Sequence, residues 1–126
     1  MADTILIVED NRNNSTLLRD ILSFHGYEIA VGFDGNEGIE LARKLMPDLI
    51  LMDIQMPNMD GMTAASILKG DPATKGLKII ALTSFAMRGD KEKFLAAGFD
   101  GYLSKPISTR ELAGQVKRWL ESKEQP

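Results

Sequence analysis

Short apolar runs in this sequence end in side chains that could do chemistry. The first run is followed by an acidic pair, the third by an aspartate, the fourth by two hydroxyl groups, and the fifth by a serine and a lysine: Glu9 and Asp10, Asp53, Thr83 and Ser84, Ser104 and Lys105. If the runs are parallel strands of one sheet, their carboxyl ends meet at one edge, where ligands of open α/β sheets bind. The spacing therefore predicts one site built from residues far apart in the chain.

The chemistry of such a site follows from its charges. Carboxylates gathered at one edge repel, because two like charges about 4 Å apart cost roughly 4 kcal/mol at an effective dielectric constant near 20. Mg2+ would offset this repulsion with Asp10 and Asp53 as direct ligands and Glu9 close by or acting through water. Lys105 would neutralise one oxygen of a phosphate and the Thr83 hydroxyl would bond another. This arrangement suits phosphoryl transfer to a carboxylate.

Other interpretations of the same residues remain open. A single aspartate after a strand is usually a turn residue or a helix cap, and a single lysine is usually a solvated charge. A phosphohydrolase is disfavoured, because Gln55 stands where such an enzyme needs a second aspartate as general acid and base. An inert binding module is disfavoured by the intact polar set. A flavin or nucleotide carrier is disfavoured by the acidic edge and by the absence of a Walker-type loop.

Strand and helix patterns alternate along the chain and would position these residues. The apolar runs are continuous rather than alternating, which is typical of strands covered on both faces in a parallel sheet. They are Ile5–Val8, Ile29–Val31, Leu49–Met52, Ile79–Leu82 and the segment around Leu103. Repeated strand and helix units predict right-handed crossovers and an open, doubly wound α/β fold with flanking helices.

Local signals predict where several helices begin and end. A polar start at Asn13–Ser15 and a stop at His25–Gly26 bracket the first helix, and Asp60–Gly61 can open the third. A fourth helix would end before Gly98. Near the C-terminus, the spacing S-x-x-E at 108–111 predicts a capping box ahead of an apolar stripe.

Length, composition and charge narrow the class of protein. The 126 residues, 44% of them hydrophobic, are enough for one domain, 1–126, and we expect its tail to fray after about residue 121. A net charge of −3 disfavours nucleic acid and anionic lipid as partners. Without cysteine, a metal must take oxygen ligands or His25. Runs such as Leu49–Met52 are too short to cross a membrane, and Met1–Thr4 begins no signal peptide, so we expect a cytoplasmic protein.

Taken together, the motifs of this chain resemble those of the response-regulator receiver family over essentially its whole length. They are I-L-I-V-E-D-N at Ile5–Asn11, L-I-L-M-D-I-Q-M-P at Leu49–Pro57, M-D-G at Met59–Gly61, A-L-T-S at Ala81–Ser84 and Y-L-S-K-P at Tyr102–Pro106. The run T-S-F-A-M-R-G-D at Thr83–Asp90 is similar to that of single-domain cell-division regulators. The resemblance implies a five-stranded sheet in the flavodoxin-like order 2-1-3-4-5 with five helices.

The resemblance also implies a function in two-component or phosphorelay signalling. A phosphohistidine on a sensor histidine kinase or a histidine phosphotransfer protein would donate a phosphoryl group to Asp53. The chain would then be a phosphoacceptor rather than an enzyme, apart from its own phosphorylation and slow dephosphorylation. Mg2+, or Mn2+ in its place, would be held by Asp10, Asp53 and the backbone carbonyl of Gln55, with Glu9 nearby. A cis peptide bond between Lys105 and Pro106 would help to aim the lysine.

The family's switch implies a way for the signal to leave. Thr83 would move toward the phosphate and Tyr102 would turn inward, although Tyr102 can also be an ordinary core aromatic. The face formed by the last strand and the helices on either side of it would then contact a downstream target or support onward phosphotransfer. Met1 and the short tail favour a stand-alone protein over a receiver excised from a hybrid kinase. We further predict that Phe85 slows dephosphorylation, so that Phe85→Ala would accelerate it.

Overall fold

Across the described residues, 2–84 and 90–122, the computed structural model contains one parallel sheet of five strands. The strands are β1 (Thr4–Val8), β2 (Glu28–Gly32), β3 (Leu49–Asp53), β4 (Ile79–Thr83) and β5 (Gly101–Ser104). Their order is β2-β1-β3-β4-β5, as the resemblance to the receiver family implied. The chain therefore reverses its direction of winding between β1 and β3, which is where ligands bind in open α/β sheets.

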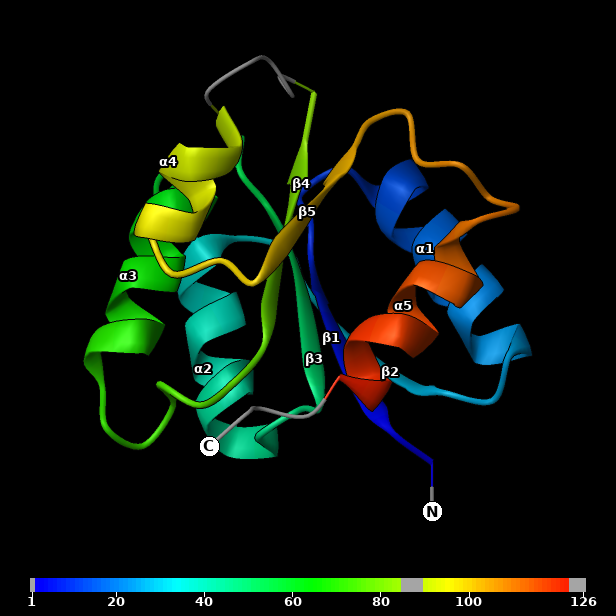
Figure 1. Cartoon of the computed structure of the whole chain (residues 1–126), viewed down its shortest axis with the longest axis horizontal. Helices are drawn as coiled ribbons and strands as arrows, with labels where there is room; N and C mark the ends of the chain where they lie inside the picture. The colour runs from blue at the N-terminus through cyan, green and yellow to red at the C-terminus, as the bar shows by residue number, and fades with distance from the viewer. Residues whose placement is uncertain (1, 85–89, 123–126) are drawn as a thin grey trace.

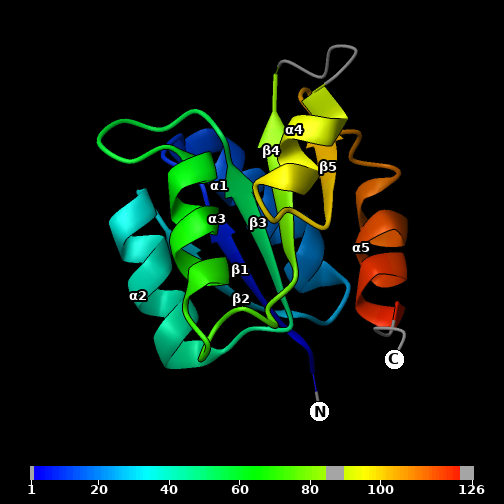
Figure 2. The same cartoon turned by 60° about the vertical axis from the view of Figure 1, so that its left-hand side comes forward.

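Five helices in the described ranges cover the two faces of this sheet. They are α1 (Arg12–Phe24), α2 (Gly35–Leu45), α3 (Gly61–Gly70), α4 (Asp90–Ala96) and α5 (Leu112–Glu121). Figure 1 shows α1 and α5 on one face and the other three helices on the opposite face, and Figure 2 agrees after a turn of 60°. Within the described residues, none of these helices has the length and apolar content needed to span a bilayer.

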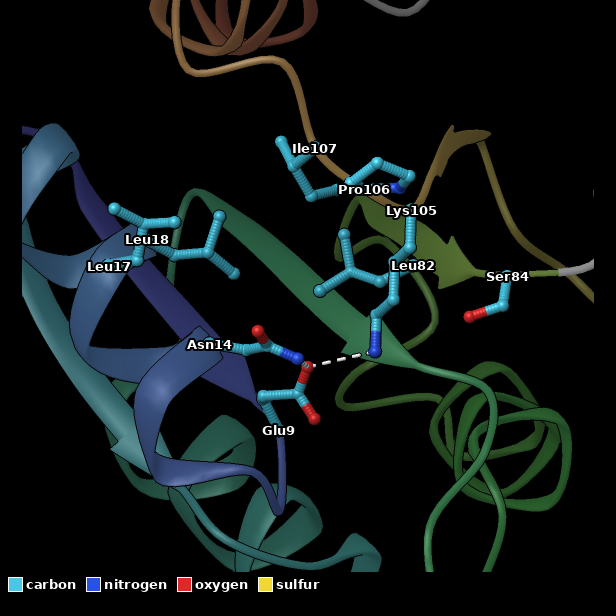
Figure 3. Close-up of a pocket in the computed structure, with 9 residues that line it drawn as sticks. All are labelled: Glu9, Asn14, Leu17, Leu18, Leu82, Ser84, Lys105, Pro106 and Ile107. Carbon is cyan, nitrogen blue, oxygen red and sulfur yellow. Dashed lines mark hydrogen bonds and ion pairs between the residues drawn. The ribbon is translucent and has the colours of Figure 1, made fainter.

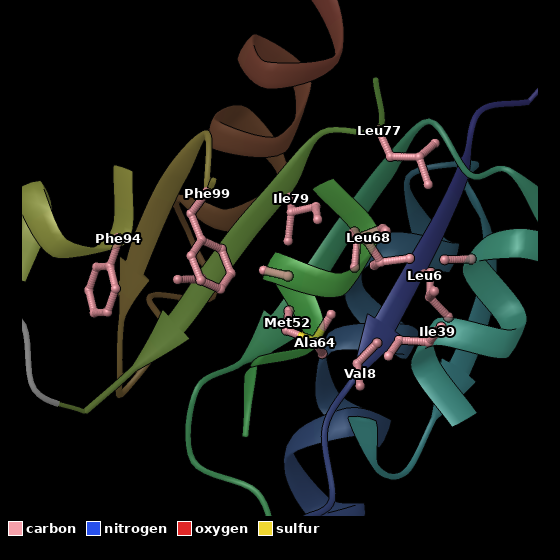
Figure 4. Close-up of a cluster of buried hydrophobic side chains, with 14 residues drawn as sticks. Leu6, Val8, Ile39, Met52, Ala64, Leu68, Leu77, Ile79, Phe94 and Phe99 are labelled. Carbon is pink, nitrogen blue, oxygen red and sulfur yellow. The ribbon is translucent and has the colours of Figure 1, made fainter. Parts of the chain in front are cut away.

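The strand pattern explains why the sheet is buried on both faces. Successive side chains of a strand point to opposite faces. Ile5 and Ile7 accordingly join the cluster under α1 and α5, while Leu6 and Val8 join the cluster under the other helices (Figure 4). These four side chains are fully buried. Each such burial stabilises the fold by about 1.5 to 3 kcal/mol. Packing on both faces of the sheet therefore holds the ends of the strands in place.

Most predicted helix boundaries are confirmed. Asn11 caps α1 with its side chain, which accepts from the backbone N–H of Asn14, so the helix begins slightly before the expected polar start. Asp60 caps α3 in the same way. His25 ends α1, and Gly26 follows with a φ of +93°, a left-handed conformation that favours glycine.

The predicted capping box at Ser108 and Glu111 is wrong. Glu111 is itself the N-cap of α5 and makes no side-chain capping hydrogen bond. The Ser108 carbonyl instead accepts from the backbone N–H groups of Glu111 and Leu112, at 3.2 and 3.0 Å. A turn therefore precedes the regular helix, which begins later than the motif suggested. Two further predictions concern residues outside the described ranges. Phe85 lies outside them, and so do residues 123–126 of the tail that we expected to fray after about residue 121.

Candidate functional site

The pairing of the sheet extends past the strand ends and into the site. The backbone N–H of Glu9 donates to the Gly32 carbonyl at 3.0 Å, and the backbone N–H of Lys105 donates to the Thr83 carbonyl at 2.7 Å. These bonds hold the two residues directly beyond β1 and β5 on the frame of the sheet. The site side chains are thus oriented by regular backbone geometry rather than by free loops.

Three carboxylates meet at this edge, as the sequence predicted. One ligand oxygen from each of Glu9, Asp10 and Asp53 lies within 4.8 Å of the others. Glu9 is 0% exposed and Asp53 is 3% exposed, whereas Asp10 lies at the surface. Hard oxygen donors at this spacing, with one open side, fit a cation such as Mg2+, which completes its shell with water or phosphate oxygens.

Lys105 is the counter-ion of the buried acids. Its Nζ lies 2.9 Å from Oε1 of Glu9 and 3.1 Å from Oδ2 of Asp53. Burial lowers the pKa of Lys105, but hydrogen bonds and charge attraction from Glu9 and Asp53 outweigh that effect and raise the pKa overall. The lysine therefore stays charged and ties the end of β5 to the ends of β1 and β3. The peptide bond between Lys105 and Pro106 is cis, as expected.

The surroundings of Glu9 disfavour the ionised form of its carboxyl group. Burial raises the pKa of Glu9, contact with Asp53 raises it further, and Lys105 opposes both effects without cancelling them. The ionised form of Glu9 is thus less favoured in the folded protein than it would be in water, even with the lysine in place. An added cation at this edge would favour that ionised form, which is a second reason that the donor set suits a metal ion.

Both oxygens of Asp53 are also engaged. Oδ2 pairs with Lys105, and Oδ1 accepts from the backbone N–H of Gln55 at 3.1 Å. This bond places the Gln55 backbone beside the carboxylate, while its side chain is exposed. The carboxyl group is therefore fixed by a donor on each side.

The sequence analysis missed the part that Gly61 has in shaping the site. Its backbone N–H donates to the Ile54 carbonyl at 3.0 Å, and a Cβ at this position would overlap the Asp53 carbonyl oxygen. Only glycine lets the start of α3 approach the end of β3 so closely. The signal in the sequence was the M-D-G motif, which we used as a family motif and as a helix start but did not connect with the shape of the site.

The two predicted switch residues lie in different environments. Thr83 ends β4 and is 1% exposed, so its side chain belongs to the buried edge of the sheet. Tyr102 on β5 is 36% exposed, and its ring is tilted against that of Phe94 with centroids 5.9 Å apart. Tyr102 is therefore not a buried core aromatic in this structure.

A cleft of about 400 Å³ opens beside the carboxylates, between α1 and the segment after β5. Leu17, Leu18 and Ile107 are among its apolar walls. Its polar end includes Glu9 and Lys105, which Figure 3 shows joined across the cleft. A ligand or partner that reached the acidic cluster by this route would pass over an apolar surface.

Comparisons with known proteins agree with this architecture. Residues 5–117 match the family model for the response regulator receiver domain. The chain is 42% identical over 120 residues to the polar-differentiation response regulator DivK of Brucella anthropi, covering 95% of this chain and 98% of that protein. These matches confirm the predicted resemblance to the receiver family and, within it, to a single-domain regulator of the DivK type.

Two solved structures of other receiver domains are similar to this chain. The receiver domain of sensor histidine kinase PA1611 from Pseudomonas aeruginosa PAO1, solved with a magnesium ion coordinated in the active-site cleft, superposes with a TM-score of 0.88 at 36% identity, covering 97% of this chain and 100% of that one. The receiver domain of Ssk1 from Saccharomyces cerevisiae, solved with the histidine phosphotransfer protein Ypd1, gives 0.87 at 29% identity, covering 94% and 88%.

Proposed function

The chain belongs to the response regulator receiver domain family, and on that premise we propose that Asp53 is its phosphoacceptor. Receiver domains of two-component systems take their phosphoryl group from histidine kinases or phosphotransfer proteins. The observation that supports Asp53 most strongly is its environment: a nearly buried carboxylate with Lys105 on one oxygen and a backbone N–H on the other. Such a group is pre-positioned for attack on phosphorus.

The transfer is a substitution at phosphorus. A carboxylate oxygen of Asp53 attacks the phosphoryl group of a phosphohistidine, an O–P bond forms, and the P–N bond breaks. The electron pair of that bond returns to the imidazole nitrogen of the donor. The product is an acyl phosphate on Asp53. Since the transition state spreads charge over the phosphoryl oxygens, the protein acts chiefly by positioning and by charge stabilisation.

Two side chains of the site would carry that stabilisation. The Lys105 ammonium, already 3.1 Å from the nucleophile, would pair with one phosphoryl oxygen. The Thr83 hydroxyl, at the end of the neighbouring strand β4, would donate to another. Both residues would therefore bind the phosphoryl group more tightly as its charge develops.

A divalent cation would complete the charge balance. We propose Mg2+ with Asp10, Asp53 and the backbone carbonyl of Gln55 as ligands and Glu9 beside them; Mn2+ suits the same oxygen donors. When bound, the ion neutralises charge on the carboxylates and on the phosphoryl oxygens. The close approach of the three carboxylates supports this assignment.

The chain would act as one receiver domain, 1–126, and as a signalling protein rather than a multiple-turnover enzyme. Its own chemistry would be limited to phosphorylation by donors and slow hydrolysis of the acyl phosphate. Gln55 supports this limit, because its amide cannot act as general acid and base beside Asp53. We propose that the exchange takes place in the cytoplasm, where sensor kinases obtain the ATP that charges their histidine.

The signal would leave through the face made by α4, β5 and α5. Thr83 moving toward the phosphoryl group would allow the half-exposed ring of Tyr102 to turn inward against β4. The contact between Tyr102 and Phe94 of α4 supports a coupling between this ring and that helix. A downstream target protein, or a phosphotransfer protein that takes the phosphoryl group onward, would detect the change.

The proposal is tested with purified protein and acetyl phosphate, followed by intact mass. We expect a gain of one phosphoryl group in Mg2+, none in EDTA, and none for Asp53→Asn in either condition. If acetyl phosphate gives no product, a phosphorylated histidine phosphotransfer protein is the second donor. A parent protein that accepts from neither donor, or an Asp53→Asn variant that accepts as fast as the parent, would contradict the proposal.

A further inference from the structure

We propose that Asn14 is a positioning residue of the phosphoacceptor site, whose side-chain amide holds Glu9 in the orientation that anchors Lys105. The proposal rests on the phosphoacceptor function of Asp53 proposed above and adds a residue to its machinery. Asn14 lies in the first turn of α1, at the polar end of the cleft (Figure 3).

The evidence begins with the hydrogen bonds of the Glu9 carboxylate. Oε1 accepts from Nζ of Lys105 at 2.9 Å and from Nδ2 of Asn14 at 3.4 Å. Oε2 accepts from the backbone N–H of Asn11 at 3.3 Å. Glu9 is fully buried, so water cannot replace a lost donor as readily as at the surface. Two of the three donors come from the start of α1, and that helix therefore sets the plane of the carboxylate.

The start of α1 is built in an unusual way that frees the Asn14 amide for this contact. In a capping box, an acidic or amide side chain at the third helical position accepts from the N–H of the cap residue. Here Glu9, from the end of β1, accepts that N–H of Asn11 instead, and Asn14 at the third position donates to Glu9. Glu9 thus takes the role that the side chain at the third helical position has in a capping box. Asn11 and Asn14 both bond Glu9 to α1.

A chain of contacts carries this orientation to the nucleophile. Asn14 donates to Glu9, Glu9 accepts from Lys105, and Lys105 pairs with Asp53. Lys105 is shared between two carboxylates at nearly equal distances. Oδ2 of Asp53 already pairs with the lysine, and if Glu9 turned away the ammonium would be drawn toward Asp53 alone and would hold that oxygen more tightly. By holding Glu9, Asn14 keeps the lysine shared and limits its hold on the nucleophile.

The structure separates this role from that of an ordinary helix residue. The capping bond of α1 uses the backbone N–H of Asn14, which any residue other than proline retains. The side chain is exposed except for its amide contact with Glu9, so a substitution leaves no large cavity. Asn14→Leu keeps the side-chain size, improves intrinsic helix propensity and removes the amide that donates to Glu9. A purely structural residue would tolerate that change without effect on the site.

The experiment compares Asn14→Leu with Asn14→Gln, which restores an amide, and with Asn13→Leu, the same change at the exposed neighbouring position. The first measurement is the hydrogen exchange rate of the Lys105 ammonium, by nitrogen-15 NMR of the metal-free protein. The second is the rate of phosphorylation at saturating acetyl phosphate and Mg2+. The ammonium of Lys78, which donates to the backbone carbonyls of Trp119 and Ser122, is an internal reference.

We expect Asn14→Leu to raise the exchange rate of the Lys105 ammonium and lower the phosphorylation rate, each by about three- to tenfold, as for the loss of one hydrogen bond of ordinary strength; the contact is long, at 3.4 Å. Asn14→Gln should recover most of both changes, and Asn13→Leu and the Lys78 signal should match the parent. An unchanged Lys105 exchange rate, or a loss that Asn13→Leu reproduces, would overturn the proposal. A parent that accepts no phosphoryl group would contradict the phosphoacceptor function, while the exchange rate would still decide whether Asn14 holds Glu9 and Lys105.

Discussion

Lys105→Met removes the positive charge between two carboxylates and keeps an unbranched side chain. At an effective dielectric constant of about 20, an ammonium 2.9 Å from Glu9 and 3.1 Å from Asp53 attracts each carboxylate by roughly 5 to 6 kcal/mol. The cost of taking the charges out of water offsets most of this attraction, and loss of one partner of a buried ion pair costs about 3 to 5 kcal/mol. Because the Lys105 side chain is 20% exposed, we expect the low end, a loss of about 3 kcal/mol in the free energy of unfolding near pH 7 without Mg2+.

That loss should depend on pH through Glu9. Burial raises the pKa of Glu9 in the folded protein, so its contribution to stability is complete below its unfolded value of about 4.5 and is lost as the pH rises through the folded pKa. Lys105 limits this loss by lowering the Glu9 pKa. Without the lysine the pKa rises further, and the loss with increasing pH becomes larger. The stability difference between the parent and Lys105→Met should therefore be small near pH 4 and grow toward pH 7.

Urea unfolding in EDTA, followed by circular dichroism at a series of pH values, measures this difference. Lys117→Met is the matched control, because Lys117 is an exposed lysine of α5 and its loss should change the free energy of unfolding by less than about 0.5 kcal/mol. Saturating Mg2+ should recover part of the stability of Lys105→Met, since a cation that binds only the folded state stabilises it.

Two results would refute the reasoning. One is a loss below about 1 kcal/mol near pH 7, which is within the range of a surface ion pair and would mean that Lys105 is not the main counter-ion of the buried acids. The other is a loss that does not change with pH, which would mean that the Met side chain disturbs packing rather than charge.

Further predictions follow from the backbone contacts around the sheet. Gly61→Ala should lower the free energy of unfolding by about 1 to 3 kcal/mol and slow phosphorylation, because its Cβ would overlap the Asp53 carbonyl. Gly70→Ala, at a position in open space on the same helix, should have neither effect. Urea unfolding measures the stability and intact mass measures the phosphorylation. Lys69→Met should cost about 1 to 2 kcal/mol in urea unfolding, since the lysine donates to the Leu77 carbonyl at 2.7 Å. Asn11→Ala should cost about 1 kcal/mol in the same assay through loss of the α1 cap.

Much of the fold could be predicted because it depends on local patterns. Continuous apolar runs marked the strands, since a strand buried on both faces has no polar side to show. Asp60 and His25 marked helix ends, because capping uses side chains and carbonyls within a few residues. The S-x-x-E spacing misled because a capping box is only one of the local conformations that this sequence allows. In the structure the segment at Ser108 forms a turn instead.

The sequence by itself determined which residues close the strands, and so which side chains could meet: Glu9, Asp10, Asp53, Thr83 and Lys105. Only the tertiary structure decided how they meet. The contact of Lys105 with Glu9 spans 96 positions of the chain and exists because the sheet brings the ends of β1 and β5 to the same edge. Burial of Glu9, sharing of the lysine, the approach of Gly61 to Asp53 and the reach of Asn14 to Glu9 all depend on that packing. They are distance-dependent interactions between distant segments, which no local spacing in the sequence encodes.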